Sequence, residues 1–440
     1  MSIIVFKKNC NHNPLFIQIL HKPPTELQLY KWDKLDCSTI QLCCEMDNHR
    51  PTVGFSCLPS ELLQSIFLRL ALPDIVRLRS INKSIASIVS DKDFVRDCNT
   101  QFLSANWLFI YSKGWRRDSV LHGFTDQSDH WFKIPIAGLL MPVIHATEDL
   151  YFLAASGNFF LFVSNTRKEL LSVNLMKRAV KKIPPSPLGP RGTSSWRRSG
   201  MKLVAGPPGS DSFRFLFAEL VENRPIMFEY NSDDDKWQSM EAEENHGDLP
   251  RVFEGAGPLI FLSVVNGTNE SVVLAIGSQG NNTPVVLRPR FSGGAIEQRQ
   301  VAVGFSWGNG IHRLQVYDDG YMMIVRSDDV DDGNTRERVL KEIEMWGLSR
   351  NGRRWERISK LPGATMEQIK RAYGVIMGCV EERNGTIRAL LMSNYRGLWH
   401  IIWLSYDIGR DDWTLLPLPD FDMKGLNMAG ITFSSGLTLV

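Results

Sequence analysis

The sequence is poor in cysteine, has no long apolar run and carries almost no net charge. Its seven cysteines include no Cys-x-x-Cys pair, and five of them precede Ser60, so a disulfide framework and a paired-ligand metal site are both disfavoured. No apolar stretch approaches the roughly 20 residues needed to cross a bilayer. The 50 basic and 48 acidic residues leave a net charge of +2, which gives no drive toward nucleic acid or anionic membranes. We therefore expect a soluble, intracellular protein without a metal or cofactor.

Catalytic signatures are also scarce. The sequence contains no P-loop and no dinucleotide-binding fingerprint. Residues 304–308 read GFSWG and match the G-x-S-x-G pattern of a nucleophile elbow, but the turn-forming residues 309–312 follow where that motif requires a helix. The aspartates of residues 328–332 lack oxygen ligands at the third and twelfth positions of a calcium loop. We expect a non-catalytic protein, and a propeller hydrolase that uses Ser306 is kept as an alternative.

Residues 1–54 are the least informative part of the chain. Their apolar residues have no sustained period, and four prolines interrupt them. We expect this N-terminal segment to be disordered or loosely packed.

Residues 55–99 change character and show helical periodicity. The sequence predicts three short amphipathic helices, the first entered through Leu58-Pro59 and capped by Ser60, the second capped by Asp74. Apolar residues recur at the 3.6-residue period in the first of them, at Leu62, Leu63, Ile66, Phe67 and Leu70. A segment this small buries only part of its apolar surface internally. The remaining surface is available to a partner, or to the rest of the chain if these helices only cap the next domain.

Two motifs in this segment, Leu58-Pro59-x-Glu61-Leu62-Leu63 and Pro73-x-x-x-x-Leu78-Arg79-x-Ile81-x-Lys83, closely resemble the F-box. The resemblance implies binding to a Skp-type adaptor of cullin-RING ubiquitin ligases. The positions that it implies as adaptor-binding are Leu58, Pro59, Leu62, Ile66, Leu70, Ile75 and Leu78. Plant F-boxes commonly carry Cys-Lys-x-Trp after the second helix, whereas this chain has Ile85 at the aromatic position. Losing that aromatic area costs roughly 1 kcal/mol, which is expected to weaken adaptor binding.

After Asn99 the pattern becomes that of short strands separated by turns, which predicts an all-β domain. A weak unit recurs in it, in which an apolar or aromatic residue is followed seven positions later by Trp or an apolar residue. Five copies are present: Phe124 with Trp131, Val173 with Val180, Tyr230 with Trp237, Leu348 with Trp355, and Tyr406 with Trp413. The second anchors are 49 to 58 residues apart except for one gap of 118, which predicts a sixth, degenerate unit near Ala295–Arg299. This period is that of a propeller blade.

The paired anchors predict a specific geometry. Two antiparallel strands joined by a tight turn place both anchors side by side, where they can pack between adjacent sheets. We therefore interpret Trp131, Trp237, Trp355 and Trp413 as core residues rather than as an aromatic ligand cage.

Three stretches, LSVNLMKRAVKKIPP, FEYNSDDDKWQSM and LSYDIGRDDWTLLPLP, resemble the degenerate kelch repeats of plant F-box/kelch proteins. The resemblance implies an F-box over residues 55–99 and a kelch-like β-propeller over residues 100–440, with six blades expected from the spacing. It also implies a substrate-recognition subunit of an SCF-type ubiquitin ligase, acting in protein degradation in the cytoplasm or nucleus on an unknown protein substrate. The alternative is a non-ligase binding protein whose F-box has become structural.

One segment between the repeats is a candidate for substrate recognition. Residues 183–210 are rich in proline and glycine, basic, and long for a loop. They hold Trp196, which lies outside the repeat register, next to Arg197 and Arg198. Arginine and tryptophan are favoured interface anchors, so these three residues are predicted to contact the substrate.

Overall fold

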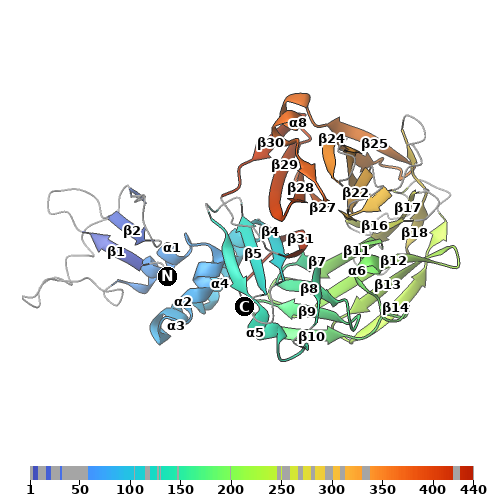
Figure 1. The fold of residues 1–440 in the computed structure, drawn as a ribbon. Helices are drawn as coiled ribbons and strands as arrows, with labels where there is room; N and C mark the ends of the chain where they lie inside the picture. The colour runs from blue at the N-terminus through green and yellow to red at the C-terminus, as the bar shows by residue number, and fades with distance from the viewer. Residues whose placement is uncertain are drawn as a thin grey trace, which may run out of the picture. The chain divides into compact units, whose positions relative to one another are not determined.

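The computed structural model forms two compact units, residues 1–70 with 77–94 and residues 71–76 with 95–440 (Figure 1). The structure describes residues 3–7, 16–20, 30–31, 58–103, 105–113, 119–125, 128, 130–145, 148–198, 200–244, 249, 258–265, 271–278, 283–292, 301–307, 313–329, 337–419 and 427–439.

The N-terminal segment contains three short strands where we expected disorder. They are β1 (Ile3–Lys7), β2 (Phe16–Leu20) and β3 (Tyr30–Lys31), and they pair antiparallel in the order β1-β2-β3. The other residues of 1–54 lie outside the described part of the chain.

Residues 58–103 form four helices rather than three. They are α1 (Ser60–Phe67), α2 (Leu72–Leu78), α3 (Lys83–Val89) and α4 (Lys92–Phe102). The apolar pattern past Ile85 predicts one continuous helix, but the Asp91 carboxylate accepts hydrogen bonds from the backbone of Asp93 (3.0 Å) and Phe94 (3.2 Å) and starts a new one.

The helix starts differ from the sequence prediction in two places. Pro59, and not Ser60, is the N-cap residue of α1, and its carbonyl accepts the first helical hydrogen bond from the backbone of Leu63 at 3.1 Å. Helix α2 begins at Leu72, before Pro73, so Asp74 lies in the first turn instead of capping it. Both prolines sit where a missing backbone N–H costs nothing, because the first turn of a helix has no partner for it.

Residues 106–435 form six sheets, numbered here in chain order (Figure 1). Sheet 1 contains β31 (Met428–Ser435), β4 (Asn106–Ser112), β5 (Val120–Thr125) and β6 (Phe132–Pro135). Sheet 2 contains β7 (Leu150–Ser156), β8 (Phe159–Ser164), β9 (Leu170–Asn174) and β10 (Ala179–Ile183). Sheet 3 contains β11 (Gly200–Ala205), β12 (Phe213–Val221), β13 (Arg224–Asn231) and β14 (Lys236–Glu241). Sheet 4 contains β16 (Leu259–Val265), β17 (Ser271–Gly277), β18 (Val285–Leu287) and β15 (Glu243–Glu244).

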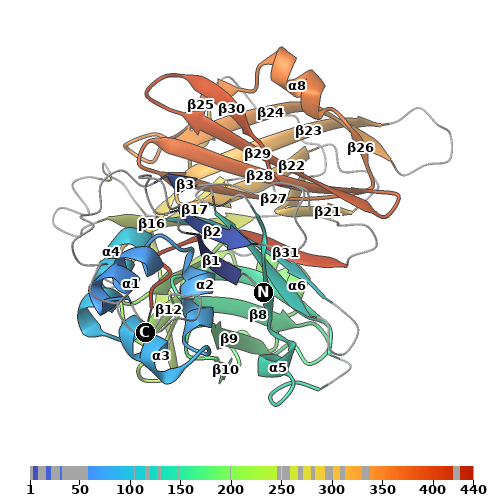
Figure 2. The ribbon, with the colours of Figure 1, turned by 90° about the vertical axis from the view of Figure 1, so that its left-hand side faces the viewer.

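Sheets 5 and 6 carry extra strands. Sheet 5 contains β20 (Val301–Val303), β22 (Arg313–Asp318), β23 (Tyr321–Asp329), β24 (Arg338–Leu348), β25 (Arg354–Lys360), β19 (Arg290–Phe291) and β26 (Ala372–Tyr373). Sheet 6 contains β21 (Phe305–Trp307), β27 (Val375–Arg383), β28 (Thr386–Tyr395), β29 (Leu398–Asp407) and β30 (Asp412–Leu416). Short helices α5 (Ala137–Leu140), α6 (Thr193–Arg198) and α8 (Gly363–Ile369) lie between strands. Figure 2 shows β23, β24 and β26 side by side.

The sheets are arranged as a propeller whose ring is closed by its two ends. One inner strand of each sheet contacts the next in the order β31, β7, β11, β16, β22, β27 and back to β31. Strand β31, the last in the chain, pairs antiparallel with β4, the first strand of the same unit. Because the first and last strands of this unit pair within one sheet, the ring closes without leaving either of them as a free edge.

The prediction of six similar blades is corrected to five. Five sheets have the four or five strands of a regular blade, whereas sheet 5 has seven strands and departs from the pattern. The degenerate unit predicted near Ala295–Arg299 falls outside the described residues. The extra strands of sheet 5 are only two or three residues long, which is too short for a periodic sequence pattern to predict them.

Glycines let the innermost strands approach one another. A Cβ at Gly200 of β11 would lie 2.5 Å from the backbone oxygen of Ser263 in β16. A Cβ at Gly378 of β27 would lie 2.9 Å from the Val316 side chain in β22. Because radial sheets converge at the axis, their inner backbones touch only where side chains are absent.

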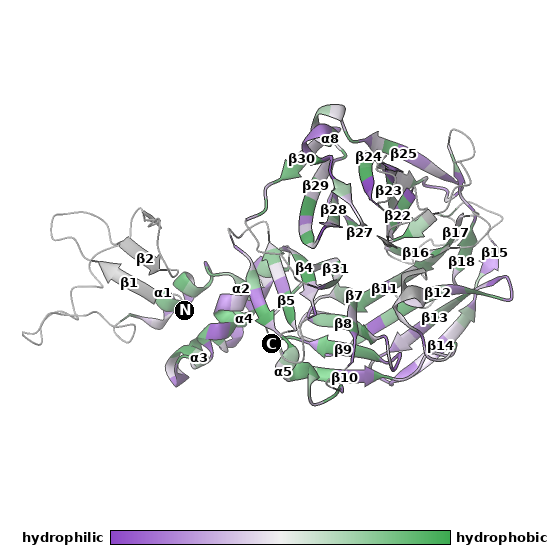
Figure 3. Cartoon of the chain, viewed as in Figure 1, coloured by the Kyte–Doolittle hydropathy of each residue, from purple (hydrophilic) through white to green (hydrophobic). Residues whose placement is uncertain are grey.

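The repeat anchors confirm the predicted geometry. Val173 pairs with Val180, Tyr230 with Trp237, Leu348 with Trp355, and Tyr406 with Trp413, each directly across two antiparallel strands. The Phe124 and Trp131 rings lie 5.1 Å apart. The central strands of the sheets are apolar and the outermost ones polar, as strands β8 and β14 illustrate in Figure 3.

The four tryptophans also tie each sheet to its neighbour. Their indole Nε1 atoms donate to the preceding sheet in the ring: Trp131 to the Pro419 carbonyl (3.2 Å), Trp237 to the Pro184 carbonyl (2.9 Å), Trp355 to Ser271 Oγ (2.8 Å) and Trp413 to Ser359 Oγ (3.0 Å). Apolar clusters fill the same spaces, for example Leu161 of sheet 2 with Phe215 of sheet 3. Trp355 is buried in the core, and Trp131, Trp237 and Trp413 are partly buried and pack against core clusters, which confirms the predicted packing role.

Candidate binding surfaces

The seven predicted adaptor-binding residues differ in how much surface they offer. Pro59 is exposed, and Leu58, Leu62 and Leu70 are half-buried. Ile66, Ile75 and Leu78 are 6%, 0% and 8% exposed. The entry to α1 and its first turn thus keep accessible apolar surface, whereas the other three side chains serve packing within this chain. Their contact with an adaptor stays a prediction.

Ile81, the isoleucine of the second F-box-like motif, is an exposed apolar residue. Helix α2 ends at Leu78, so Ile81 falls in the turn before α3 and is 60% exposed. No other large apolar side chain of the described residues is as exposed. The only sequence feature that singles out Ile81 is its place in the motif Leu78-Arg79-x-Ile81.

Ile85, the position of the departure from the plant pattern, is enclosed by this chain. Its side chain is 4% exposed, and its backbone N–H donates to the Asn82 side chain at 2.8 Å, which caps α3. Helices α1 and α3 contact each other. The substitution therefore changes internal packing of the helical segment, and any effect on an adaptor would act through that packing.

The segment predicted as a substrate-recognition loop includes regular structure. Within residues 183–210, α6 and β11 take up much of the chain. The Trp196 side chain is 3% exposed and donates from Nε1 to the Arg191 carbonyl at 3.2 Å. Its ring packs edge-on against Phe217 at 5.0 Å, and the Arg191 guanidinium lies 4.9 Å from the ring centre.

Trp196 is thus an internal anchor that holds α6 against sheet 3. A side chain buried to this degree presents no surface to a partner. The side chains of Arg197 and Arg198, at the end of α6, lie outside the described residues.

Ser306 does not lie on a nucleophile elbow. It is the middle residue of β21, where it pairs with Ile376 of β27. An elbow requires a sharp turn from strand to helix at the serine. The G-x-S-x-G match is therefore a strand in this fold.

A cavity of about 290 Å³ lies at the axis of the ring. Its lining comes from the innermost strands of all six sheets, β31, β7, β11, β16, β22 and β27, together with Val303 and Gly304. Sequence analysis did not find this cavity, because the strands that line it are far apart in the chain.

Four charged side chains line this axial cavity. Lys202 Nζ of β11 lies 2.7 Å from Asp318 Oδ1 and 3.2 Å from Asp319 Oδ2. These three side chains are 28%, 22% and 34% exposed although protein surrounds them, because they face the cavity. Burial raises the pKa of Asp318, and Lys202 opposes that effect.

Glu381 of β27 is the fourth charged residue, and it is incompletely satisfied. Its Oε2 atom is buried and has no hydrogen-bond partner. Burial, and next the negative charge of Asp318, raise the pKa of Glu381 to about 7. The thiol of Cys379, two residues earlier on the same strand, also lines the cavity, and burial raises its pKa.

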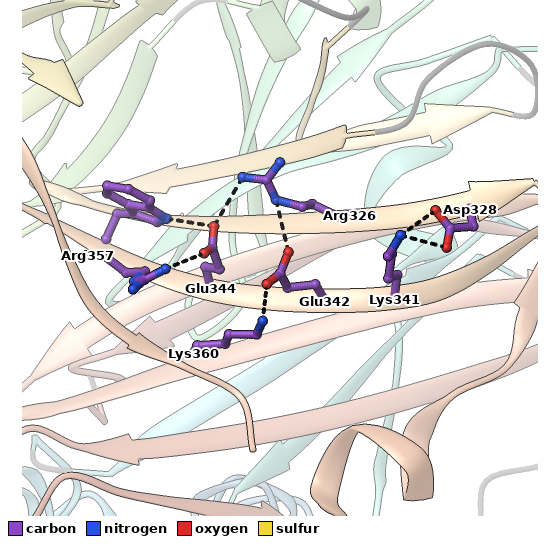
Figure 4. Close-up of polar contacts among 8 residues, drawn as sticks. Arg326, Asp328, Lys341, Glu342, Glu344, Arg357 and Lys360 are labelled. Atoms are coloured by element: carbon purple, nitrogen blue, oxygen red, sulfur yellow. Dashed lines mark hydrogen bonds and ion pairs between the residues drawn. The ribbon is translucent and has the colours of Figure 1, made fainter. Parts of the chain in front are cut away.

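A second charged group, on sheet 5, is a network of ion pairs and hydrogen bonds (Figure 4). The Glu344 carboxylate accepts from Arg326 at 3.4 Å, from Arg357 at 3.3 Å and from the Trp346 indole at 3.3 Å. Glu342 pairs with Arg326 at 3.2 Å and with Lys360, and Lys341 pairs with Asp328 at 3.0 Å. Charges compensated in this way stabilise a sheet and leave nothing for a ligand.

Comparison with known proteins identifies the helical segment. The F-box domain family matches residues 55–97. The chain therefore carries an F-box domain, followed by an all-β, propeller-like domain. No curated protein matches the chain. No helix among the described residues combines the length and apolar character needed to span a bilayer.

Several solved structures are similar to the chain over much of its length. One is a chain of the nidogen/laminin complex, with 8% identity over 76% of this chain and 99% of that chain and a TM-score of 0.37. Another is apo AztD from Citrobacter koseri, with 11% identity over 76% and 99% and a TM-score of 0.30. A third is an ulvan lyase, a polysaccharide lyase, with 11% identity over 73% and 89% and a TM-score of 0.34. At such TM-scores these likenesses carry no argument.

Proposed function

We propose that this chain is the substrate-recognition subunit of an SCF-type cullin-RING ubiquitin ligase. The F-box match over residues 55–97, directly before a propeller-like domain, is the observation that carries the proposal. In this reading the F-box docks a Skp-type adaptor and the kelch-like propeller binds the protein to be ubiquitinated. The chain performs no bond chemistry itself. It raises the effective concentration of the substrate beside the conjugating enzyme.

The accessible apolar residues at the start of α1 support adaptor docking there. Leu58, Pro59 and Leu62 retain solvent contact, so removing their side chains weakens binding more than it weakens folding. Ile66, Leu70, Ile75 and Leu78 complete the proposed adaptor-binding set.

Co-purification of the full chain with a Skp-type adaptor tests the proposal. We expect the double variant Leu58→Ala and Pro59→Ala to lose adaptor, and Ser65→Ala, at an exposed position of α1, to retain it. Retention of adaptor by the double variant would rule out this docking mode. Failure of the wild-type chain to bind any Skp-type adaptor would sink the ligase proposal.

A non-ligase binding protein with a structural F-box is the second candidate. The burial of Ile66, Ile75 and Leu78 within this chain, and the isoleucine at position 85, are the observations that favour it. Reconstituted ubiquitination of proteins captured by the chain separates the two, because only a ligase subunit transfers ubiquitin to its captured partner.

For substrate binding, we propose that Arg197 and Arg198 contact the partner while Trp196 positions helix α6. Joint Arg197→Ala and Arg198→Ala replacement is expected to reduce substrate capture without loss of adaptor. Trp196→Ala is expected to reduce the folded fraction as well, since its indole is buried.

A further inference from the structure

A second cavity, of about 340 Å³, lies away from the axis of the ring and is called the outer cavity below. Helix α8 and strands β29 and β30, near the top of Figure 1, border it. It shares no lining residue with the axial cavity. Its volume falls in the range of binding sites, roughly 300–1,000 Å³. The lining is mostly apolar, and most of it comes from β29 and the end of β30: Ile401, Ile402, Leu415, Leu416, Pro417 and Leu418.

The charge in the outer cavity is positive. Arg371 and His400 line it, and none of the described residues that line it is a carboxylate. Arg371 Nη1 lies 3.1 Å from His400 Nδ1. A guanidinium can only donate, so His400 accepts through Nδ1 and is neutral. Burial, and next the charge of Arg371, lower the pKa of His400, as expected where no acid lies close by.

The backbone holds Arg371 at a fixed place between sheets 5 and 6. Its carbonyl accepts from the backbone of Leu340 in β24 at 3.4 Å, and the next residue, Ala372, pairs with β24. Glu367, the acidic residue nearest to Arg371 in the sequence, forms an ion pair with Lys370 at 3.2 Å instead. Among the described residues, no carboxylate forms an ion pair with Arg371. Its charge is therefore available to an acid from outside the fold.

Strand β29 has an incompletely paired edge beside this cavity. It pairs with β28 from Leu398 to Asp407, but with β30 only from Trp403 to Asp407. In the described sheet, residues 398–402 thus have a strand partner on one side only. Leu398 and Leu415, which lie near this edge, are 43% and 37% exposed. A strand edge of this kind can pair with an extended segment, whose side chains cover the apolar surface.

We propose that the outer cavity docks an extended segment of a partner protein that carries aspartate or glutamate next to apolar side chains. The carboxylate binds Arg371, which has further N–H donors beside the one that goes to His400. The apolar side chains cover Ile402 and Leu415, and the backbone of the segment lies along the open edge of β29. The positive charge without a paired acid is what selects an acidic segment over a neutral one.

Fluorescence anisotropy with the full chain and labelled, end-blocked peptide pools tests the proposal. In the first pool one Glu is flanked by Leu, Ile, Val or Phe. In the second pool Gln replaces the Glu, and in the third Ser replaces the apolar residues. We expect the first pool to bind, and the other two to bind about tenfold more weakly or less, since each lacks one half of the recognition.

Arg371→Gln is expected to weaken binding of the first pool about tenfold or more, because the charged donor is lost. Lys370→Gln removes the same charge at the adjacent position, outside the cavity lining, and is the matched control that should bind as wild type. Leu415→Ser, at an exposed position, should weaken binding without changing thermal unfolding. Thermal unfolding also verifies that the two charge variants are folded.

Three results would overturn the proposal. They are no binding of the first pool to folded wild-type protein, equal binding of the Glu and Gln pools, or equal loss in Arg371→Gln and Lys370→Gln. Dimerisation of the chain that Arg371→Gln abolishes, with no peptide bound, would assign the surface to a second copy instead. The titration contains no adaptor, so its outcome is independent of the proposed ligase function.

Discussion

Glu344 and Glu381 are two carboxylates in adjacent sheets of the propeller, and their surroundings differ in one respect. Glu344 is 4% exposed and accepts from two arginines and an indole (Figure 4). Glu381 lines the axial cavity, its Oε2 atom is buried without a hydrogen-bond partner, and its pKa is raised to about 7. The hydrogen bonds of Glu344 hold its carboxylate in place.

The difference between these two carboxylates lies in whether the fold supplies hydrogen-bond donors to them. Polar groups within one sheet, such as Glu344, and between sheets, such as the anchor tryptophans, find partners in the fold itself. At the axis, where the inner strands converge, the Glu381 Oε2 atom is buried without a hydrogen-bond partner. Satisfied groups contribute to stability, whereas a buried group without a partner is a cost that the rest of the fold must offset.

The largest effect is expected from Glu344→Ala. It leaves Arg326 and Arg357 without their shared acceptor, which should destabilise the fold by about 3 kcal/mol because one partner of a buried pair is lost. Urea unfolding measures it. Glu356→Ala, at an exposed position of β25, is the control and should change stability by less than about 0.5 kcal/mol. Equal effects would mean that the network in Figure 4 contributes nothing specific.

Glu381→Gln is expected to stabilise the fold, whereas Glu344→Ala destabilises it. The folded-state pKa of about 7 lies above the ordinary value of 4.5, so the wild-type fold loses stability as pH rises from 4.5 through 7. The variant lacks this titration and should be more stable by about 2 kcal/mol at about pH 8, with little difference at about pH 4. Unfolding curves at both pH values measure it. A variant less stable than wild type at the higher pH would contradict the description of Glu381 as unsatisfied.

The sequence was sufficient to predict the paired anchors but not the cavity. The seven-residue spacing of Tyr230 and Trp237 follows from local turn geometry, so it is visible in the chain and confirmed as a direct cross-strand pair. The axial cavity brings together Lys202, Asp318 and Glu381 from three different sheets. Because these residues are far apart in the sequence, no local sequence pattern predicts that they line one cavity.

The errors have the same physical origin. Trp196 is outside the repeat register and therefore looked like a surface residue, but its ring packs against Phe215 and Phe217 of β12. Ser60 looked like a helix cap, but the extended Pro59 before it already starts α1. The F-box motif was recognisable because its residues are contiguous, and the family match supports it.

Replacing an anchor tryptophan by phenylalanine is expected to change the stability of the fold less than either glutamate substitution. Trp237→Phe removes the indole donor to the Pro184 carbonyl and should cost about 1 kcal/mol. Trp355→Phe should cost somewhat more, because that side chain is 0% exposed and leaves a void as well. Thermal unfolding of both variants measures this order. The reverse order would show that the hydrogen bond, and not burial, dominates at these anchors.

The smallest effect is expected at the tyrosine anchors, whose hydroxyls also find partners within the fold. Tyr406 donates to Asp411 Oδ1 at 2.8 Å, five residues on, and Asp411 takes a left-handed backbone with φ of 53° in the turn. Tyr406→Phe removes this bond while keeping the ring, so about 0.5–1 kcal/mol should be lost. Asp411→Gly removes the acceptor and suits the left-handed backbone. In a double-mutant cycle the two changes should not add, because each deletes the same bond. Strict additivity would mean that the tyrosine anchor, unlike Glu344, contributes only by packing.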